Sequence, residues 1–97
     1  MFMRITWAKL RPGTFEQHAA KHRELKRDID GLKARWLSRD ISDPDAIFAL
    51  SLWESIEAMR AWEGSEFYTT VYLPSLRRHM EGEYTVAVCE VVNAEGL

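Results

Sequence analysis

The 97-residue sequence contains a single cysteine, Cys89, so no disulfide can form within the chain. Glycine (5 residues) and proline (3 residues) are also scarce, which excludes a linker-rich chain and favours one folded domain over residues 1–97. No apolar run is long enough to cross a bilayer, and the N-terminal stretch MFMRITW lacks the apolar core and cleavage site of a signal peptide. Because a lone cysteine suits a reducing compartment, these absences predict a cytoplasmic protein.

The sequence has no large excess of positive or negative charge: its net charge is −2, and the basic residues are not gathered in one segment. Without a basic stripe or a glycine-rich aromatic RNA-binding signature, nucleic acid is not expected as a partner. No nicotinamide, flavin or metal motif appears, so no cofactor is expected. Aromatic residues, by contrast, are plentiful: four tryptophans, four phenylalanines and three tyrosines predict a well-filled core, an aromatic-lined pocket or an interface.

The stretch from Ile47 to Trp62 organises the predicted fold. Its first seven residues, Ile47–Trp53, are largely apolar on both alternating faces, which is typical of a strand covered on both sides. Ser55 is then a good N-cap for a helix on which Met59 and Trp62 lie at helical spacing. The sequence therefore predicts a central strand that leads directly into a helix packed back on the sheet.

The other elements follow from alternation, helical spacing and turn residues. In order, the sequence predicts a strand over Phe2–Leu10, a helix from Thr14 to a cap at Gly31, a strand over Ala34–Ile41, the strand and helix just described, a further helical segment that Pro74 kinks or restarts, and a strand over Glu83–Val92. This β-α-β-β-α-β order is that of the α+β ferredoxin-like fold, a four-stranded antiparallel sheet with helices on one face. The core covers about residues 3–92, and residues 93–97 form a short tail.

One face of this predicted sheet has no cover within the chain. Two helices can cover only one face, yet the first, third and fourth predicted strands carry apolar residues on both faces. A second copy of the chain is the simplest cover, so we predict a homodimer in which two sheets pack face to face through the open sheet face. Cys89, on the last strand, is then expected to be a small buried hydrophobe.

His18 and His22 lie four residues apart on one face of the first predicted helix. They belong to its apolar stripe, which consists of Phe15, His18, His22, Leu25, Ile29 and Leu32. Either is a candidate general base, because an imidazole pKa of about 6.5 suits proton transfer near neutral pH. A metal-binding pair is an alternative, but neither Cys89 nor His79 lies at a spacing that nominates it as a third ligand, so no metal is predicted. Hydrogen-bonded structural histidines are the other alternative.

Three further residues are candidates for substrate binding. Arg4 lies among apolar residues of the first strand, where it would meet an anionic substrate or, alternatively, pair with an acidic residue across the dimer, since buried charges are usually paired. Phe67 and Tyr72 continue the apolar side of the second helical region beyond Gly64, together with Val71 and Leu76.

The run Trp53-Glu54-Ser55, followed by Ala58, Trp62 and Ser65, resembles the antibiotic biosynthesis monooxygenase family of dimeric α+β barrel proteins. The resemblance covers about Met3 to Val92 and is most specific at the W-E-S junction with a tryptophan nine residues later. It implies a pocket between the helices and the concave face of the sheet in each subunit.

The resemblance allows two activities to be compared residue by residue. Cofactor-free oxygenases of aromatic quinols in this family carry a helix tryptophan and a tyrosine six residues later, which Trp62 and Tyr68 match, although Ala58 stands in place of a neighbouring asparagine. Haem-degrading members carry an asparagine on the first strand, the same tryptophan, and a histidine ten residues later. Here Trp7 and Tyr72 occupy the first and last of these positions.

The resemblance therefore implies a cofactor-independent monooxygenase that acts on a small electron-rich aromatic such as a quinol. His18 or His22 would remove a proton, and Trp62 and Tyr68 would stabilise the resulting oxyanion through the indole N–H and the phenol O–H. The alternatives are a non-catalytic dimer that binds a small hydrophobic ligand, and a haem-binding relative with Tyr72 as an altered ligand. The structural alternative places Trp62 in the core and Tyr68 at the surface or an interface.

Overall fold

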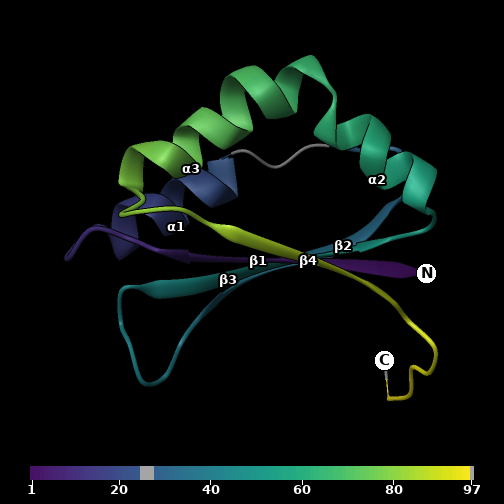
Figure 1. The fold of residues 1–97 in the computed structure, drawn as a ribbon, viewed down its shortest axis with the longest axis horizontal. Coiled ribbons are helices and arrows are strands. Elements are labelled where there is room, and N and C mark those ends of the chain that lie inside the picture. The colour runs from purple at the N-terminus through teal and green to yellow at the C-terminus, as the bar shows by residue number, and fades with distance from the viewer. Residues whose placement is uncertain (25–27, 97) are drawn as a thin grey trace.

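A computed structural model describes residues 1–24 and 28–96. The elements are β1 (Phe2–Lys9), α1 (Phe15–Glu24), β2 (Leu32–Arg39), β3 (Ala46–Trp53), α2 (Ile56–Glu63), the π-helical segment η1 (Tyr68–Tyr72), α3 (Leu73–His79) and β4 (Thr85–Glu90). The strands form one antiparallel sheet in the order β2-β3-β1-β4, and the helices lie on one face of it (Figure 1). The predicted α+β ferredoxin-like fold is confirmed. None of the described helices has the length and apolar composition needed to cross a membrane.

The strand register decides which side chains face the helices. Arg4 of β1 is paired with Ser51 of β3, and Ser51 is paired in turn with Arg35 of β2. Directly paired residues point to the same side of a sheet, so these three side chains share one face. Arg4 is buried there, which identifies the shared face as the one beneath the helices.

Two buried clusters lie between the helices and the sheet. The first consists of Ala8, Leu10, Ile47, Leu76 and Met80, and the second of Trp53, Met59, Trp62 and Tyr68. β3 contributes to both clusters, because Ile47 lies near its start and Trp53 at its end. The predicted alternation of this strand therefore places side chains of one strand in both clusters of the core.

The junction from β3 into α2 forms as the sequence predicts. The Ser55 side chain caps α2 by accepting a hydrogen bond from the backbone N–H of Ala58 at 3.1 Å. Beyond the C-cap at Gly64, the Ser65 hydroxyl accepts from the N–H of Tyr68 at 3.2 Å and starts the next helical segment. After two α-helical residues that segment continues as the π-helix η1 (Tyr68–Tyr72), which no feature of the sequence predicted.

The predicted end of the first helix is wrong. The described part of α1 is Phe15–Glu24, the chain is not helical at Asp28, and Gly31 lies in a turn before β2 with a φ of +79°, so it is not the cap of that helix. Ile29 and Leu32 therefore do not extend the helical stripe, and Leu25 lies outside the described residues. Both Ile29 and Leu32 pack against the cluster around Trp53 and are partly buried by it, although neither is helical.

The turn at Gly31 is packed closely on α2. The Gly31 carbonyl accepts a hydrogen bond from the N–H of Glu54 at 2.7 Å, and a Cβ at Gly31 would lie 2.5 Å from the Cβ of Ala58. Because a positive φ costs a non-glycine residue about 1–2 kcal/mol and overpacking about 1–3 kcal/mol, we expect Gly31→Ala to lower the free energy of unfolding by about 3 kcal/mol in urea titration.

Gly13→Ala is the matched control for this prediction, because Gly13 has the same φ of +79° and its Cβ would meet nothing within 4 Å. It should show the backbone cost alone. The double variant Gly31→Ala/Ala58→Gly should recover the part that is due to the clash. A loss at Gly31 no larger than that at Gly13 would contradict the close packing of this turn on α2.

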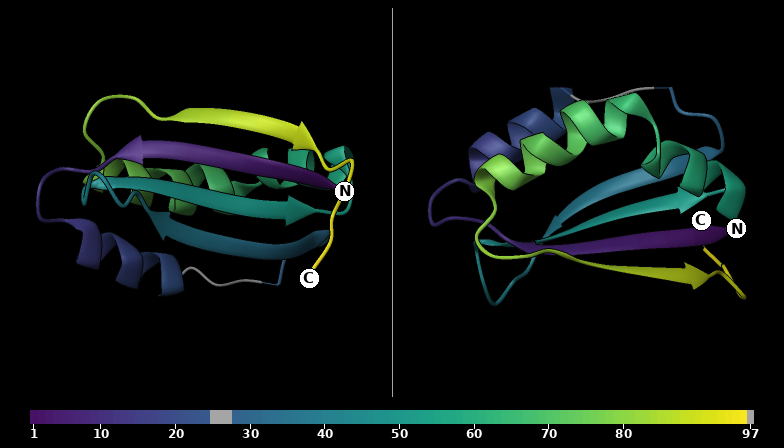
Figure 2. Two further views of the ribbon diagram at one scale, coloured as in Figure 1. Left: turned by 90° about the horizontal axis from the view of Figure 1, so that it is seen from below. Right: turned by 45° about the horizontal axis from the view of Figure 1, so that its top comes forward.

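β4 lies at the free edge of the sheet and is exposed along its whole length (Figure 2). Cys89 is exposed, so the prediction that it is a buried hydrophobe is wrong for the single chain. Val71, expected on the apolar side of the second helical region, is also exposed, at 39%. Cys89 is exposed because it is paired with Met3, on the sheet face away from the helices, and because only β1 pairs with its strand.

Candidate functional site

A cleft opens between the helices and the sheet, and it has two compartments. The tryptophan compartment, named for Trp53 and Trp62, has a volume of about 370 Å³ including its mouth. The histidine compartment, named for His18, has a volume of about 420 Å³. The two share the lining residues Arg4, Thr6, His22, Ala49 and Tyr72, so they adjoin.

Arg4 forms the floor between the two compartments. Its guanidinium donates to Glu63 Oε2 at 2.7 Å, to Thr6 Oγ1 at 2.9 Å and to the hydroxyl of Tyr68 at 3.0 Å. The predicted ion pair across a dimer is wrong in its partner, because the acidic residue belongs to the same chain. β1 passes beneath the end of α2, where Glu63 is the last residue, and this places the acid within reach.

Glu63 is held ionised by its neighbours. Burial on its own would raise the pKa of this carboxyl, but hydrogen bonds from Arg4 and Arg60 outweigh that effect and lower the pKa. The Arg4 guanidinium also lies 5.5 Å from the ring centroids of both Trp62 and Tyr68, at cation–π distance. Arg4 therefore connects the sheet, α2 and η1 through one buried charge.

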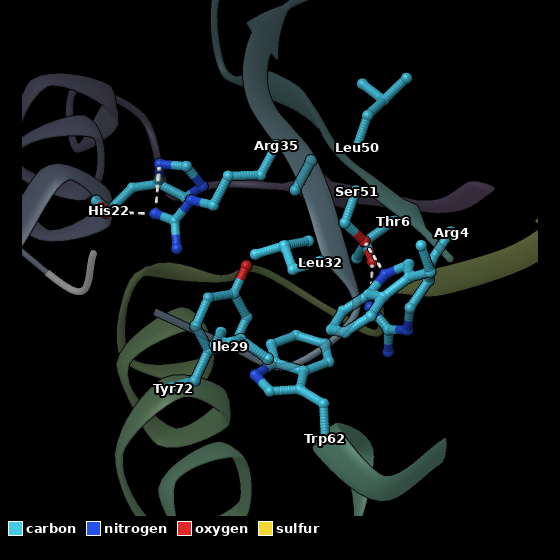
Figure 3. A pocket seen from close by; sticks show the side chains of 12 residues that line it. Arg4, Thr6, His22, Ile29, Leu32, Arg35, Leu50, Ser51, Trp62 and Tyr72 are labelled. Carbon is cyan, nitrogen blue, oxygen red and sulfur yellow. Dashed lines mark hydrogen bonds between the residues drawn. The ribbon is translucent and has the colours of Figure 1, made fainter. Parts of the chain in front are cut away.

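Trp62 is the centre of an aromatic group above Arg4. Its ring centroid lies 5.3 Å from that of Trp53, 4.5 Å from that of Tyr68 and 5.3 Å from that of Tyr72. Figure 3 shows Trp62 and Tyr72 projecting from the helical side into the tryptophan compartment, opposite the strand residues Ser51 and Thr6. The structure thus brings together three of the residues predicted for the site.

The indole N–H groups of Trp53 and Trp62 differ in their hydrogen bonding. Trp53 Nε1 donates to Ser51 Oγ at 2.8 Å. Trp62 Nε1 is buried and, in the part of the chain that the structure describes, has no hydrogen-bond partner. Leaving a buried donor unsatisfied costs about 1–3 kcal/mol, so an oxygen atom of a bound ligand would offset that cost.

Tyr68 is buried, with 6% of its surface exposed, so the alternative that placed it at the surface is wrong. Burial raises the pKa of its phenol, although Arg4 opposes the shift, and the hydroxyl therefore stays protonated at neutral pH. Because Arg4 donates to the phenol oxygen, the Tyr68 proton is directed to another acceptor, and a hydrogen bond to Tyr84 also raises the pKa of Tyr68. Burial likewise raises the pKa of Tyr72.

His18 and His22 both line the cleft, as the helical spacing predicted, but each has a partner other than the other histidine. His18 Nδ1 lies 3.3 Å from Nδ1 of His79, and His22 Nδ1 lies 3.1 Å from Nη2 of Arg35. Sequence reasoning did not place His79 or Arg35 at the site. His18 and His79 are 61 positions apart in the sequence, so no local signal predicts their contact.

The basicity assumed for these histidines is too high. Burial, followed by the charge of His79, lowers the pKa of His18 to about 4. Burial, followed by the charges of Arg35, His18 and Arg23, lowers the pKa of His22 to about 4. Both rings are neutral at pH 7, as a proton acceptor must be, but each one alone is a weak base.

Phe67 lies apart from the cleft, in an outer groove on the far side of Trp62 that also exposes Ala58 and Ala61. It therefore does not join the other predicted substrate-binding residues, Arg4 and Tyr72. Within residues 1–24 and 28–96, no three side chains of histidine, cysteine, aspartate or glutamate gather in a way that could hold a metal ion.

Residues 1–72 match the family described as antibiotic biosynthesis monooxygenase. The chain belongs to this family. The match includes the β3–α2 junction and the aromatic residues Trp62, Tyr68 and Tyr72 at the cleft. The expected family resemblance is confirmed.

Solved structures agree on the fold of this family member. A crystal structure of an antibiotic biosynthesis monooxygenase superposes with a TM-score of 0.80 at 22% identity and covers 96% of this chain and 100% of its own. A protein of Caulobacter crescentus CB15, assigned by its name to the same family, gives 0.83 at 16% identity over 95% and 90% of the two chains. At these identities the likeness shows the fold alone.

A mutant of MhuD, solved with two manganese protoporphyrin IX molecules bound per active site, is also similar. Its TM-score is 0.72 at 20% identity, and the match covers 99% of each chain. A search of curated proteins found no match to this sequence.

Proposed function

We propose that this family member is a cofactor-independent monooxygenase that acts on a small electron-rich aromatic of the quinol class, bound in the cleft. The observation that carries the proposal is the buried indole N–H of Trp62, which lines the tryptophan compartment without a protein partner among the described residues. A donor held in this way is prepared for an oxygen on which negative charge develops.

The aromatic residues at the cleft bind the substrate in two ways, by ring packing and by hydrogen bonding. The substrate ring packs against Trp62 and Tyr72, and its ionised oxygen accepts hydrogen bonds from Trp62 Nε1 and the Tyr68 hydroxyl. The donation from Arg4 to the Tyr68 oxygen keeps the phenol proton directed away from the guanidinium. His18 or His22 accepts the substrate proton, being neutral at pH 7.

The substrate supplies all the electrons for the reaction. Its deprotonated form passes an electron to oxygen and then combines with it. Where a methylene carbon becomes a carbonyl, one oxygen atom enters the product and the other leaves as water, so no external reductant is required. The helices cover the cleft and limit the access of bulk water to the ionised substrate.

A homodimer formed through the open sheet face belongs to this proposal. The face opposite the helices carries apolar side chains that share one side in the strand register: Met3, Ile5, Trp7, Trp36, Phe48, Leu50 and Leu52. Trp36 is 43% exposed in the single chain. A second sheet would cover these groups, and sedimentation at micromolar concentration should give particles of twice 11.3 kDa.

A non-catalytic protein that binds a small hydrophobic ligand is the second candidate. The low basicity of His18 and His22 favours it, because a weak base removes a phenolic proton poorly. Porphyrin binding, with Tyr72 as a ligand, is the remaining alternative, and only the fold shared with MhuD favours it.

Oxygen consumption by purified, chelator-treated protein against a panel of quinols and anthrones tests the function. Uptake that saturates with substrate and persists in chelator is the expected result. Uptake no faster than in buffer, together with tight binding of the same compounds, would replace the oxygenase with the binding protein. A Soret band on reconstitution with haem that is lost in Tyr72→Phe would favour the porphyrin alternative.

A further inference from the structure

We propose that His79 and His18 form a relay that carries a proton between the cleft and solvent. The inference rests on the proposed function, because the proton that it carries is the one lost by the bound substrate. It adds a residue, His79 on α3, that lies outside the cleft lining and acts through His18.

The two imidazoles are arranged for proton transfer. Their Nδ1 atoms are 3.3 Å apart, and their ring planes meet at 78° with centroids 5.4 Å apart. A hydrogen bond between two such nitrogens needs one N–H donor and one bare acceptor, so the relay places a single proton between the rings. This shared proton allows a proton to be transferred from one ring to the other.

The burial of the two rings gives the relay its direction. His18 is 6% exposed and lines the histidine compartment, together with Tyr68 and Tyr84. His79 ends α3, is only half-buried and is not part of the cleft lining. A proton that enters at His18 therefore leaves toward solvent at His79.

The relay removes the difficulty that His18 is a weak base. A positive charge confined to His18 would remain in the buried environment that lowers its pKa. When His18 gives up its Nδ1 proton as its Nε2 accepts one, the charge appears on His79 instead. The nearby charges of Arg78 and Arg11, after burial, lower the pKa of His79 and favour release of its proton to water.

The proton balance is as follows. The substrate O–H or C–H gives its proton to His18 Nε2, and the Nδ1 proton of His18 moves to His79 Nδ1. His79 then releases its Nε2 proton to water. The exchange leaves both rings neutral with their tautomers reversed, and returning one proton through the same atoms to the reduced oxygen resets the pair.

Other ionisable groups surround the pair and enter any pH profile. His22 on α1 is bonded to Arg35 of β2, and its pKa responds to the charge of His18. Tyr68, Tyr72 and Tyr84 line the same compartment. Direct observation of the ring nitrogens is therefore a cleaner test than a pH profile of turnover.

Nitrogen NMR of the histidine rings in the ligand-free chain is the first test. The relay predicts one ring protonated at Nδ1 and the other at Nε2 near neutral pH, and a change in the His18 nitrogen shifts in His79→Gln. Two rings that both carry their proton on Nε2 would overturn the proposal, because no proton would then lie between them.

The second test follows ionisation of a hydroxyanthraquinone, a coloured phenol that is already oxidised and so reports deprotonation without oxygen chemistry. We expect His79→Gln to slow its ionisation on the protein by about tenfold or more with an unchanged Kd. We expect imidazole in the buffer to restore the rate in His79→Ala. Unchanged ionisation in His79→Gln would overturn the relay, whereas failure of quinol oxygenation with these results intact would overturn only the oxygenase.

Discussion

Trp62→Phe should lower the kcat for quinol oxygenation by about 100-fold or more, because loss of one buried donor to a developing oxyanion typically has that effect. The phenylalanine ring keeps most of the packing against Tyr68 and Tyr72 but has no N–H. KM should change little if the interaction forms chiefly in the transition state. Initial rates of oxygen uptake at saturating substrate measure the effect.

Trp53→Phe is the matched control for this substitution. It removes an indole from the same aromatic group, but that indole N–H is already bonded to Ser51. We expect Trp53→Phe to cost more stability than Trp62→Phe, because it breaks a hydrogen bond whereas the other change removes an unsatisfied donor. Equal losses of kcat in the two variants would contradict a specific role for the Trp62 N–H.

Arg4→Met should lower the free energy of unfolding by about 3–5 kcal/mol, the range for breaking one side of a buried ion pair. The change leaves Glu63 half-buried without its closest cation and leaves the hydroxyls of Thr6 and Tyr68 without their donor. Urea denaturation at pH 7 measures the loss. The methionine side chain keeps most of the length and apolar surface of the arginine.

The double variant Arg4→Met/Glu63→Gln is the control for the ion pair. Removing the carboxylate charge as well should recover part of the stability, because the uncompensated charge is then absent. If the double variant is no more stable than Arg4→Met, the loss arises from packing. A loss below about 1 kcal/mol in Arg4→Met itself would contradict a structural role for the buried guanidinium.

Much of the fold could be predicted because its signals are local. Each of these signals involves only a few neighbouring residues. They are the alternation along β1 and β3, the cap at Ser55 and the glycine after α2, and the structure contains all of them. The end of α1 could not be predicted in the same way. Ile29 and Leu32 keep helical spacing with the helix before them, but they are partly buried by packing against residues of β3 and α2 that follow much later in the sequence.

The candidate site was predictable in its residue types and not in its connections. Helical spacing placed His18 and His22 on one face, and the family pattern selected Trp62 with Tyr68. The partners of the site residues were not predictable. Arg4 bonds to Glu63, 59 positions away in the sequence, and His18 contacts His79, 61 positions away. Such pairs depend on the register of the sheet and on where the helices cross it.

The sequence by itself determined the order of the elements, the apolar character of both sheet faces and the aromatic residues available for a cleft. Only the tertiary structure decided which indole N–H is bonded and which is left without a partner, and how far burial lowers the basicity of His18. Periodicity and capping act between neighbours in the chain, whereas desolvation and hydrogen bonding act between neighbours in space.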